Sequence, residues 1–200
     1  MKKTSPAWFN SFRNNYIQNY IFLVIRAYHN IPKESHKKVK LEEDRRTELV
    51  KSMRHLKNEF YINFPIAYET GEGTKRMDIC CYLDGLSEDY YICFECKRFL
   101  SQSITNSNFD GEYYSEGIKR FEQGQYSPKM SQAGMLSFLE TGTMVKLENL
   151  MRVKLPQTAA DSQMEDISNE YVFPNVFKTL HKRENGLGNI HLYHILLDFT

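Results

Sequence analysis

The chain has 200 residues, of which 41% are hydrophobic and 26% are charged, and its formal net charge is +1. This composition is close to the average of globular domains and excludes a disordered, collagen-like or low-complexity protein. The length suits one domain with a large core. The small net charge argues against a highly basic nucleic-acid coat but permits a local basic groove.

Cysteine content and hydropathy indicate a protein of a reducing compartment. Four Cys residues in this length do not make a secreted disulfide framework, and no secretory pattern follows the first residues. The longest unbroken apolar run near the start covers residues 20–25, far fewer than the roughly 20 residues that span a bilayer. We therefore expect a cytoplasmic protein without membrane association.

Two helices are expected in the first third of the chain. Apolar residues at spacings of three and four predict a helix over residues 8–28, and we interpret it as docked on its own core in preference to a dimerisation or target-binding helix. A second helix is expected over residues 39–57, with Leu49, Met53 and Leu56 facing inward and an acidic first turn that suits the helix dipole. Lys and Arg outnumber acids over residues 33–57, which makes this segment a candidate basic patch.

The rest of the chain alternates between strand-like and helix-like patterns. Strands are predicted over residues 60–68, 76–83, 90–99, 133–139 and 190–199, helices over 114–123 and 145–153, and loops over 101–112 and 156–170. Asp84-Gly85 is a hairpin signal between the second and third strands. This order predicts an α/β (α+β) fold, a three-layer sandwich with a central mixed β-sheet flanked by helices.

Asp78, Glu95 and Lys97 form the most informative group of polar residues. Side chains alternate along a strand, so Glu95 and Lys97 share one face. If the hairpin is centred between residues 86 and 87, Asp78 lies directly opposite Glu95, with Cβ atoms about 4.5 to 5.5 Å apart. A tight turn on Asp84-Gly85 would shift each strand by two residues and leave the face unchanged. Two adjacent carboxylates suit Mg²⁺, and a neighbouring ammonium can position a water or steady a phosphate charge.

This arrangement resembles the PD-(D/E)xK nuclease superfamily, which has the restriction-endonuclease-like fold. The match consists of Asp78 and Glu95-Cys96-Lys97 with the elements around them, over about residues 39–140, and Met77 replaces the Pro of the family name. The resemblance implies that Asp78 and Glu95 bind Mg²⁺, for which Mn²⁺ can substitute. It also implies that the Cys96 carbonyl is a further metal ligand and that Lys97 positions the attacking water.

Members of this superfamily often complete the site with an acid on the preceding helix. Glu43 is our choice, because EDRRTEL looks like the helix start seen in several members. Glu42 follows closely, since it lies on the apolar stripe of its helix, and Glu48 is third. The expected organisation is a single domain over residues 1–200, with a helical extension to residue 38, a catalytic core over 39–140 and a C-terminal helix with strands over 141–200.

Several polar residues are candidates for substrate contacts. Lys75, Arg76 and Arg98 flank the motif, and Gly117, Lys119, Arg120, Gln123 and Tyr126 follow it; of these we select Arg76, Arg98, Arg120, Gln123 and Tyr126. Cations near a phosphate backbone imply affinity rather than sequence choice. The run His181, Lys182 and Arg183 is interpreted as a surface cluster.

Zinc and histidine chemistry are the rival interpretations. Cys80, Cys81, Cys93 and Cys96 give a CC…CxxC pattern, but Cys93 and Cys96 would face opposite sides of a strand, so we expect buried thiols instead of a zinc site. His191 and His194 would likewise face apart, which favours core or interface histidines.

The sequence thus leads to two functional hypotheses. In the first, the protein is a Mg²⁺-dependent nuclease, a DNA endonuclease in preference to one acting on RNA, of a prokaryotic restriction, phage-defence or repair system. In the second, it is a catalytically inactive nuclease-fold module that binds nucleic acid or a protein partner. The sequence leaves open whether a homodimer or a partner protein is needed.

Overall fold

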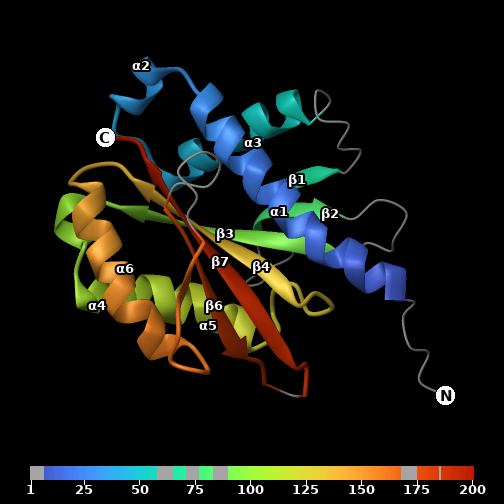
Figure 1. Cartoon of the computed structure of the whole chain (residues 1–200). Helices are drawn as coiled ribbons and strands as arrows, with labels where there is room; N and C mark the ends of the chain where they lie inside the picture. Colours follow the sequence, from blue (N-terminus) through green and yellow to red (C-terminus); the bar gives the residue numbers. More distant parts are fainter. Residues whose placement is uncertain (1–6, 58–64, 71–76, 83–89, 168–174, 185) are drawn as a thin grey trace.

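The computed structural model describes residues 7–57, 65–70, 77–82, 90–167, 175–184 and 186–200 (Figure 1). The helical elements are α1 (Ala7–Asn30), α2 (Lys33–His36), α3 (Glu42–Leu56), η2 (Ser101–Ser103), α4 (Asn106–Asn108), η3 (Phe109–Ile118), α5 (Lys119–Glu122) and α6 (Met144–Thr158). The strands are β1 (Ile66–Thr70), β2 (Met77–Tyr82), β3 (Tyr91–Phe99), β4 (Gln132–Leu139), β5 (Glu165–Asp166), β6 (Val176–Lys182) and β7 (Asn189–Asp198).

Within the described residues the strands form one mixed sheet in the order β1-β2-β3-β4-β7-β6-β5. The pairs β3–β4 and β4–β7 are parallel, and the remaining neighbours are antiparallel. The last strand in the chain, β7, therefore lies inside the sheet between β4 and β6. Its central position explains the nearly continuous apolar run IHLYHILLDF, since a strand covered on both faces needs apolar side chains on both.

Helices cover both faces of the sheet, which confirms the predicted three-layer α/β sandwich. One core joins α1 and α3 to the face that carries Ile79, Phe94 and Cys96. The other joins η3 and α6 to the face that carries Cys80 and Cys93. Figure 1 shows α1 and α3 on one side of the sheet and α5 and α6 on the other. Along the described side chains of α1, residues such as Ile17, Tyr20 and Val24 are fully buried, as expected for a helix docked on its own core.

The segment over residues 101–112 differs from the prediction. Its Ser, Asn and Gly residues suggest a loop, yet most of it is helical and leads into η3, a π-helical stretch. The Thr105 hydroxyl caps this helix by accepting the Asn108 N–H at 3.2 Å, and Phe109 and Tyr113 are fully buried. Capping and burial thus outweigh weak helix propensity. The predicted loop over 156–170 is also shorter than expected, because α6 extends to Thr158 and β5 follows.

The sequence analysis did not identify β6, and the strand that it expected over residues 60–68 continues two residues further, since β1 ends at Thr70. The residues 60–64 of that prediction and the Asp84-Gly85 turn lie outside the described residues. Strand β6 was missed because Lys178, Thr179 and His181 interrupt its apolar pattern. Thr179 and His181 are nevertheless buried.

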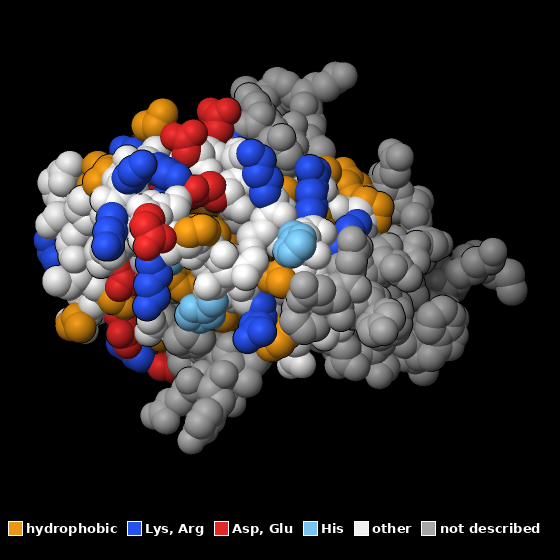
Figure 2. Space-filling model, turned by 90° about the horizontal axis from the view of Figure 1, so that it is seen from above, with side chains coloured by type: hydrophobic (Ala, Val, Ile, Leu, Met, Phe, Trp, Pro, Cys, Tyr) orange, Lys and Arg blue, Asp and Glu red, His pale blue; other side chains and the backbone are white. Residues whose placement is uncertain are grey.

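The surface of residues 33–57 does not carry cations alone. Exposed Lys33, Lys37 and Lys51 lie in the same segment as exposed Glu34 and Glu43. Figure 2, seen from above, shows Lys and Arg side chains interspersed with Asp and Glu on that face. No helix within the described residues is long and apolar enough to cross a membrane.

Candidate functional site

The pairing of β2 with β3 brings the sequence motif together. Cys80 pairs with Cys93 and Ile79 with Phe94, so the same register continued by one residue places Asp78 opposite Glu95. This is the register expected for a hairpin centred between residues 86 and 87. Asp78, Glu95 and Lys97 thus share the face of the sheet that η3 and α5 cover.

Asp78 is held between a helix and the neighbouring strand. Its Oδ1 lies 2.5 Å from Nη1 of Arg46 on α3, and its Oδ2 accepts the backbone N–H of Cys96 at 2.7 Å. Arg46 lies four residues after Glu42 on the same helix face and was not singled out from the sequence. Cys96 thus contributes its N–H to the site, while the role of its carbonyl as a metal ligand remains a prediction.

Glu95 is the most perturbed carboxyl group of the site. The residue is 2% exposed, and its Oε1 lies 3.0 Å from Nζ of Lys97 and 3.6 Å from Nη1 of Arg120. Its Oε2 is buried and has no hydrogen-bond partner among the described residues. Burial and the charge of Asp78 raise the pKa of Glu95 to about 8, against the opposing effect of Lys97 and Arg120.

Lys97 remains an ammonium group despite its partial burial. Burial acts to lower its pKa, but the carboxylates of Glu95, Glu42 and Asp78 outweigh this effect and leave the pKa of Lys97 raised. The group therefore can donate hydrogen bonds to a water or a phosphate oxygen but cannot serve as a general base near neutral pH.

Glu42, and not Glu43, is the helix acid beside this group. The Oε2 of Glu42 accepts the backbone N–H of Arg98 at 2.9 Å, and burial together with Asp78 raises its pKa, partly offset by Lys97. Glu43 is exposed, because one residue along a helix turns the side chain by about 100°. The choice of Glu43 is thus corrected to Glu42, which the apolar stripe of the helix already indicated. Glu48 lies elsewhere, paired with Lys40.

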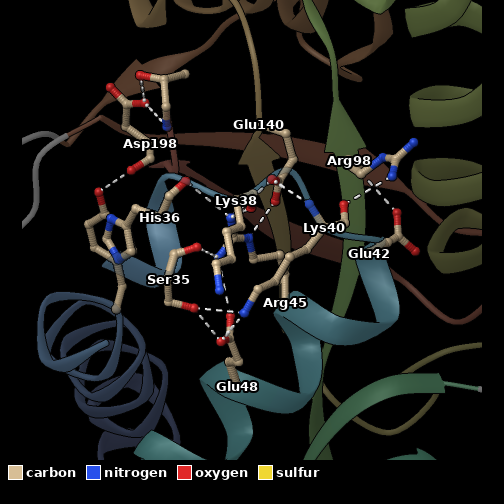
Figure 3. A network of polar contacts seen from close by, with 12 residues as sticks. Ser35, His36, Lys38, Lys40, Glu42, Arg45, Glu48, Arg98, Glu140 and Asp198 are labelled. Carbon is tan, nitrogen blue, oxygen red and sulfur yellow. Dashed lines mark hydrogen bonds and ion pairs between the residues drawn. The ribbon is translucent and has the colours of Figure 1, made fainter. Parts of the chain in front are cut away.

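A buried ion pair fixes the start of α3 over the sheet (Figure 3). Arg45 is fully buried, and its Nε donates to Oε1 of Glu140 at 2.5 Å, while its Nη2 donates to the Lys38 carbonyl at 2.7 Å. Glu140 directly follows β4, so the pair ties the helix to the end of the sheet at which Lys97 lies. Arg98 adds a further contact by donating to the Lys40 carbonyl at 3.0 Å. These contacts place Glu42 next to β3.

A cleft of about 330 Å³ opens beside Lys97 and Glu42. Arg98, Asn108 and Glu112 contribute to its walls. Of the proposed substrate residues, Arg98 therefore lies at the cleft, although its guanidinium already contacts a backbone carbonyl.

The other proposed substrate residues lie at different places. Arg120 reaches toward Glu95 and donates to the Tyr126 hydroxyl at 2.6 Å, so these two residues belong to the site. Gln123 accepts from Gln125, and no described contact brings it to Glu95. Arg76 and Lys75 lie outside the described residues.

The cysteines and histidines take the places expected for core residues, with one correction. All four cysteines are free and buried, and Cys93 and Cys96 belong to opposite cores. His194 is fully buried. The surface interpretation of His181 and Arg183 is wrong, because both are buried: His181 contacts Glu122, and Arg183 donates to backbone carbonyls.

The site offers oxygen ligands of the kind that Mg²⁺ prefers. Within the described residues, no group of three or more His, Cys, Asp or Glu side chains is arranged to hold a metal ion. The charge of Asp78 nevertheless raises the pKa of both Glu42 and Glu95, so Asp78 lies close to both carboxyl groups. The buried, unpartnered Oε2 of Glu95 is the atom that a cation would satisfy. The chemistry of the donor set therefore fits a divalent cation.

Comparison of the chain with family models, with curated proteins and with solved structures finds no match. The function of the site is therefore inferred from its own residues.

Proposed function

We propose that this protein is a divalent-metal-dependent nuclease that hydrolyses phosphodiester bonds, with DNA as its substrate. The observation that carries the proposal is Glu95, a buried carboxyl group with one unpartnered oxygen, opposite Asp78 and hydrogen-bonded to Lys97. The spacing of these three residues is the feature that resembles the PD-(D/E)xK superfamily. Their placement around a hairpin of the kind expected for that fold supports the same proposal.

In this proposal Asp78, Glu95 and Glu42 hold the cation. A bound Mg²⁺ or Mn²⁺ ion neutralises negative charge that develops on the phosphate and lowers the pKa of a bound water. Lys97, as an ammonium, donates a hydrogen bond to the attacking water or to a phosphate oxygen and steadies its charge. Arg120 and Arg98 supply positive charge beside the site, which favours a phosphate group without selecting a sequence.

The test is cleavage of supercoiled plasmid DNA by the purified full chain in Mg²⁺, Mn²⁺ or EDTA. We expect nicking or linearisation that requires metal and is lost in Lys97→Ala but kept in Glu43→Gln, a matched change of an exposed acid. Single-stranded DNA and RNA of the same length test the substrate class. Cleavage that persists in Lys97→Ala or in EDTA would refute the site assignment.

Asp78→Ala is a less suitable variant than Lys97→Ala for this test. Its side chain and that of Arg46 are 15% and 8% exposed, and their ion pair joins β2 to α3. Removing one partner of a buried pair costs about 3–5 kcal/mol, so we expect this variant to melt at a lower temperature than the unsubstituted protein. Lys97→Ala is better suited to the test. It leaves behind the carboxyl group of Glu95, which is largely protonated near neutral pH because its pKa is about 8.

A binding module with the same fold is the second candidate. The observation in its favour is that both strand carboxylates face basic side chains, Asp78 toward Arg46 and Glu95 toward Lys97. Metal-linked thermal stabilisation separates the two candidates. A nuclease gains melting temperature in Ca²⁺ or Mn²⁺ and loses that gain in Glu95→Gln, whereas a module without a metal site shows no gain in either protein.

A further inference from the structure

A chain of buried polar side chains crosses the sheet face beneath η3 and α5. It runs from Ser137 through Tyr113, His194, Thr179 and His181 to Glu122. The contacts measure 3.5 Å from Ser137 to Tyr113, 3.0 Å from Tyr113 to Nδ1 of His194, 2.7 Å from Thr179 to Nε2 of each histidine, and 3.0 Å from Nδ1 of His181 to Glu122. Every member except Glu122 is at most 2% exposed.

The donors of this chain can point in only one direction when Glu122 is ionised and both histidine rings are neutral. A carboxylate only accepts, so Nδ1 of His181 carries the proton that it donates to Glu122. In a neutral ring, Nε2 of His181 then accepts, and the single hydroxyl proton of Thr179 goes to it.

The same reasoning extends to the other half of the chain. Because Thr179 has no second proton, it must accept from Nε2–H of His194. Nδ1 of His194 is therefore the acceptor for the Tyr113 hydroxyl. Burial lowers the pKa of His194 well below its usual value, in agreement with a neutral ring.

Two members of the chain, Tyr113 and Glu122, belong to one helical segment. Tyr113 lies in η3 and Glu122 at the end of α5, whereas the histidines and Thr179 lie on β6 and β7. The chain therefore ties this helical segment to the sheet at two points, one near each end. A continuous run of satisfied buried hydrogen bonds gives such a tie a defined geometry that apolar packing alone does not impose.

The residues between these two points contact the proposed catalytic group. A Cβ on Gly117 would lie 3.4 Å from Cε of Lys97 and 2.7 Å from Cε of Met135, so the helix backbone packs directly on the lysine side chain. Arg120, one turn later, reaches Glu95 at 3.6 Å. Any shift of the segment between Tyr113 and Glu122 would move both contacts.

We propose that Tyr113, His194, Thr179, His181 and Glu122 are positioning residues that fix the η3–α5 segment against Lys97 and Glu95. Their effect on cleavage rests on the proposed function. The attachment of the η3–α5 segment to the sheet, and the single direction of the hydrogen bonds, do not depend on the proposed function.

Thr179 is the position at which this run of hydrogen bonds can be interrupted with the least disturbance of the packing. Thr179→Val removes the hydroxyl and keeps the branched shape, while Thr179→Ser keeps the hydroxyl and serves as the matched conservative variant. Thr158→Val is a second control, because the Thr158 hydroxyl donates only to a helix carbonyl at the end of α6. All measurements use the full chain at temperatures well below unfolding.

Nitrogen NMR of the imidazole rings reads the tautomers directly. In the unsubstituted protein we expect the proton of His194 on Nε2 and that of His181 on Nδ1. In Thr179→Val we expect the single tautomer of His194 to be lost, and in Thr179→Ser to be retained. The opposite tautomers in the unsubstituted protein would overturn the assigned direction.

Cleavage kinetics and hydrogen exchange test the positioning role. We expect kcat to fall about 10- to 100-fold in Thr179→Val with KM unchanged, since small misplacements at a site cost rate rather than binding, and to recover in Thr179→Ser. Unchanged kcat in Thr179→Val would overturn the proposal.

If the unsubstituted protein cleaves nothing, the proposed function fails. Hydrogen exchange alone then tests whether these residues hold the η3–α5 segment against the sheet. Lost amide protection across residues 113–122 in Thr179→Val, but not in Thr179→Ser or Thr158→Val, supports it. Equal protection in all four proteins refutes it.

Discussion

Glu95→Gln is the change that most directly tests the electrostatics of the site. Glu95 is 2% exposed, and its pKa is raised from 4.5 to about 8. The folded protein therefore binds a proton there that the unfolded chain releases above pH 4.5. The resulting stabilisation is fully present below pH 4.5 and is lost as the pH rises through 8. Each unit of pKa corresponds to about 1.4 kcal/mol, so the loss is about 3–5 kcal/mol for a group that shares its charge with neighbours.

Glutamine keeps the shape of the side chain and an oxygen that accepts from Lys97, but it does not titrate. We therefore expect the free energy of unfolding of Glu95→Gln to exceed that of the unsubstituted protein by a growing margin from pH 5 to pH 9. Urea unfolding in EDTA at pH 5, 7 and 9 measures this margin, and Glu43→Gln, a change of an exposed acid, serves as the control. A margin that does not vary with pH would refute the assigned environment of Glu95. Added Mg²⁺ or Ca²⁺ at pH 9 should narrow the margin by stabilising only the protein that keeps the carboxylate.

Three further predictions concern other residues of the site and of its surroundings. Plasmid cleavage in Mg²⁺ should fall about tenfold or more in Glu42→Gln and remain unchanged in Glu43→Gln, because only Glu42 lies beside Lys97, where the proposed function places the cation; equal rates would restore Glu43 as an alternative. Gly117→Ala should change the free energy of unfolding in urea by less than about 1 kcal/mol, because its Cβ would meet only the terminal carbon of the flexible Met135 side chain at 2.7 Å and Ala favours a helix over Gly; a loss of several kcal/mol would show that Met135 cannot move aside. Glu140→Ala leaves the fully buried Arg45 without its carboxylate and should cost about 3–5 kcal/mol by thermal or urea unfolding, whereas a loss under 1 kcal/mol would show that the pair does not anchor α3.

Much of the architecture follows from local patterns in the sequence. The strands that carry Asp78 and Glu95, the parallel strand β4 and the central strand β7 are all visible as apolar runs, because a strand that is covered on both faces is built mostly from apolar residues. The sequence left two hairpin registers open, and the pairing of β2 with β3 in the structure decided between them. These elements suffice for the fold class.

Local patterns failed where a distant contact outweighs propensity. The segment 101–112 is helical because Phe109 and Tyr113 are buried, although its Ser, Asn and Gly residues favour a loop. Strand β6 was not predicted because polar residues occupy some of its buried positions, and their hydrogen-bond partners lie on other elements. A sequence shows that a residue is polar, but it does not show whether a hydrogen-bond partner lies beside that residue in the folded core.

The residues of the candidate site could likewise be predicted only in part from the sequence. The sequence alone determined that two acids and a lysine share one face of a hairpin, since strand alternation fixes that relation within a few residues. Only the tertiary structure decided that Glu42 rather than Glu43 joins them, through the rotation of α3 that Arg45 and Glu140 hold in place. The buried chain from Tyr113 to Glu122 could likewise not be predicted, because it joins the η3–α5 segment to strands β6 and β7, which lie far from that segment in the sequence. Hydrogen-bond geometry between such elements is set by packing, and packing is a property of the folded chain.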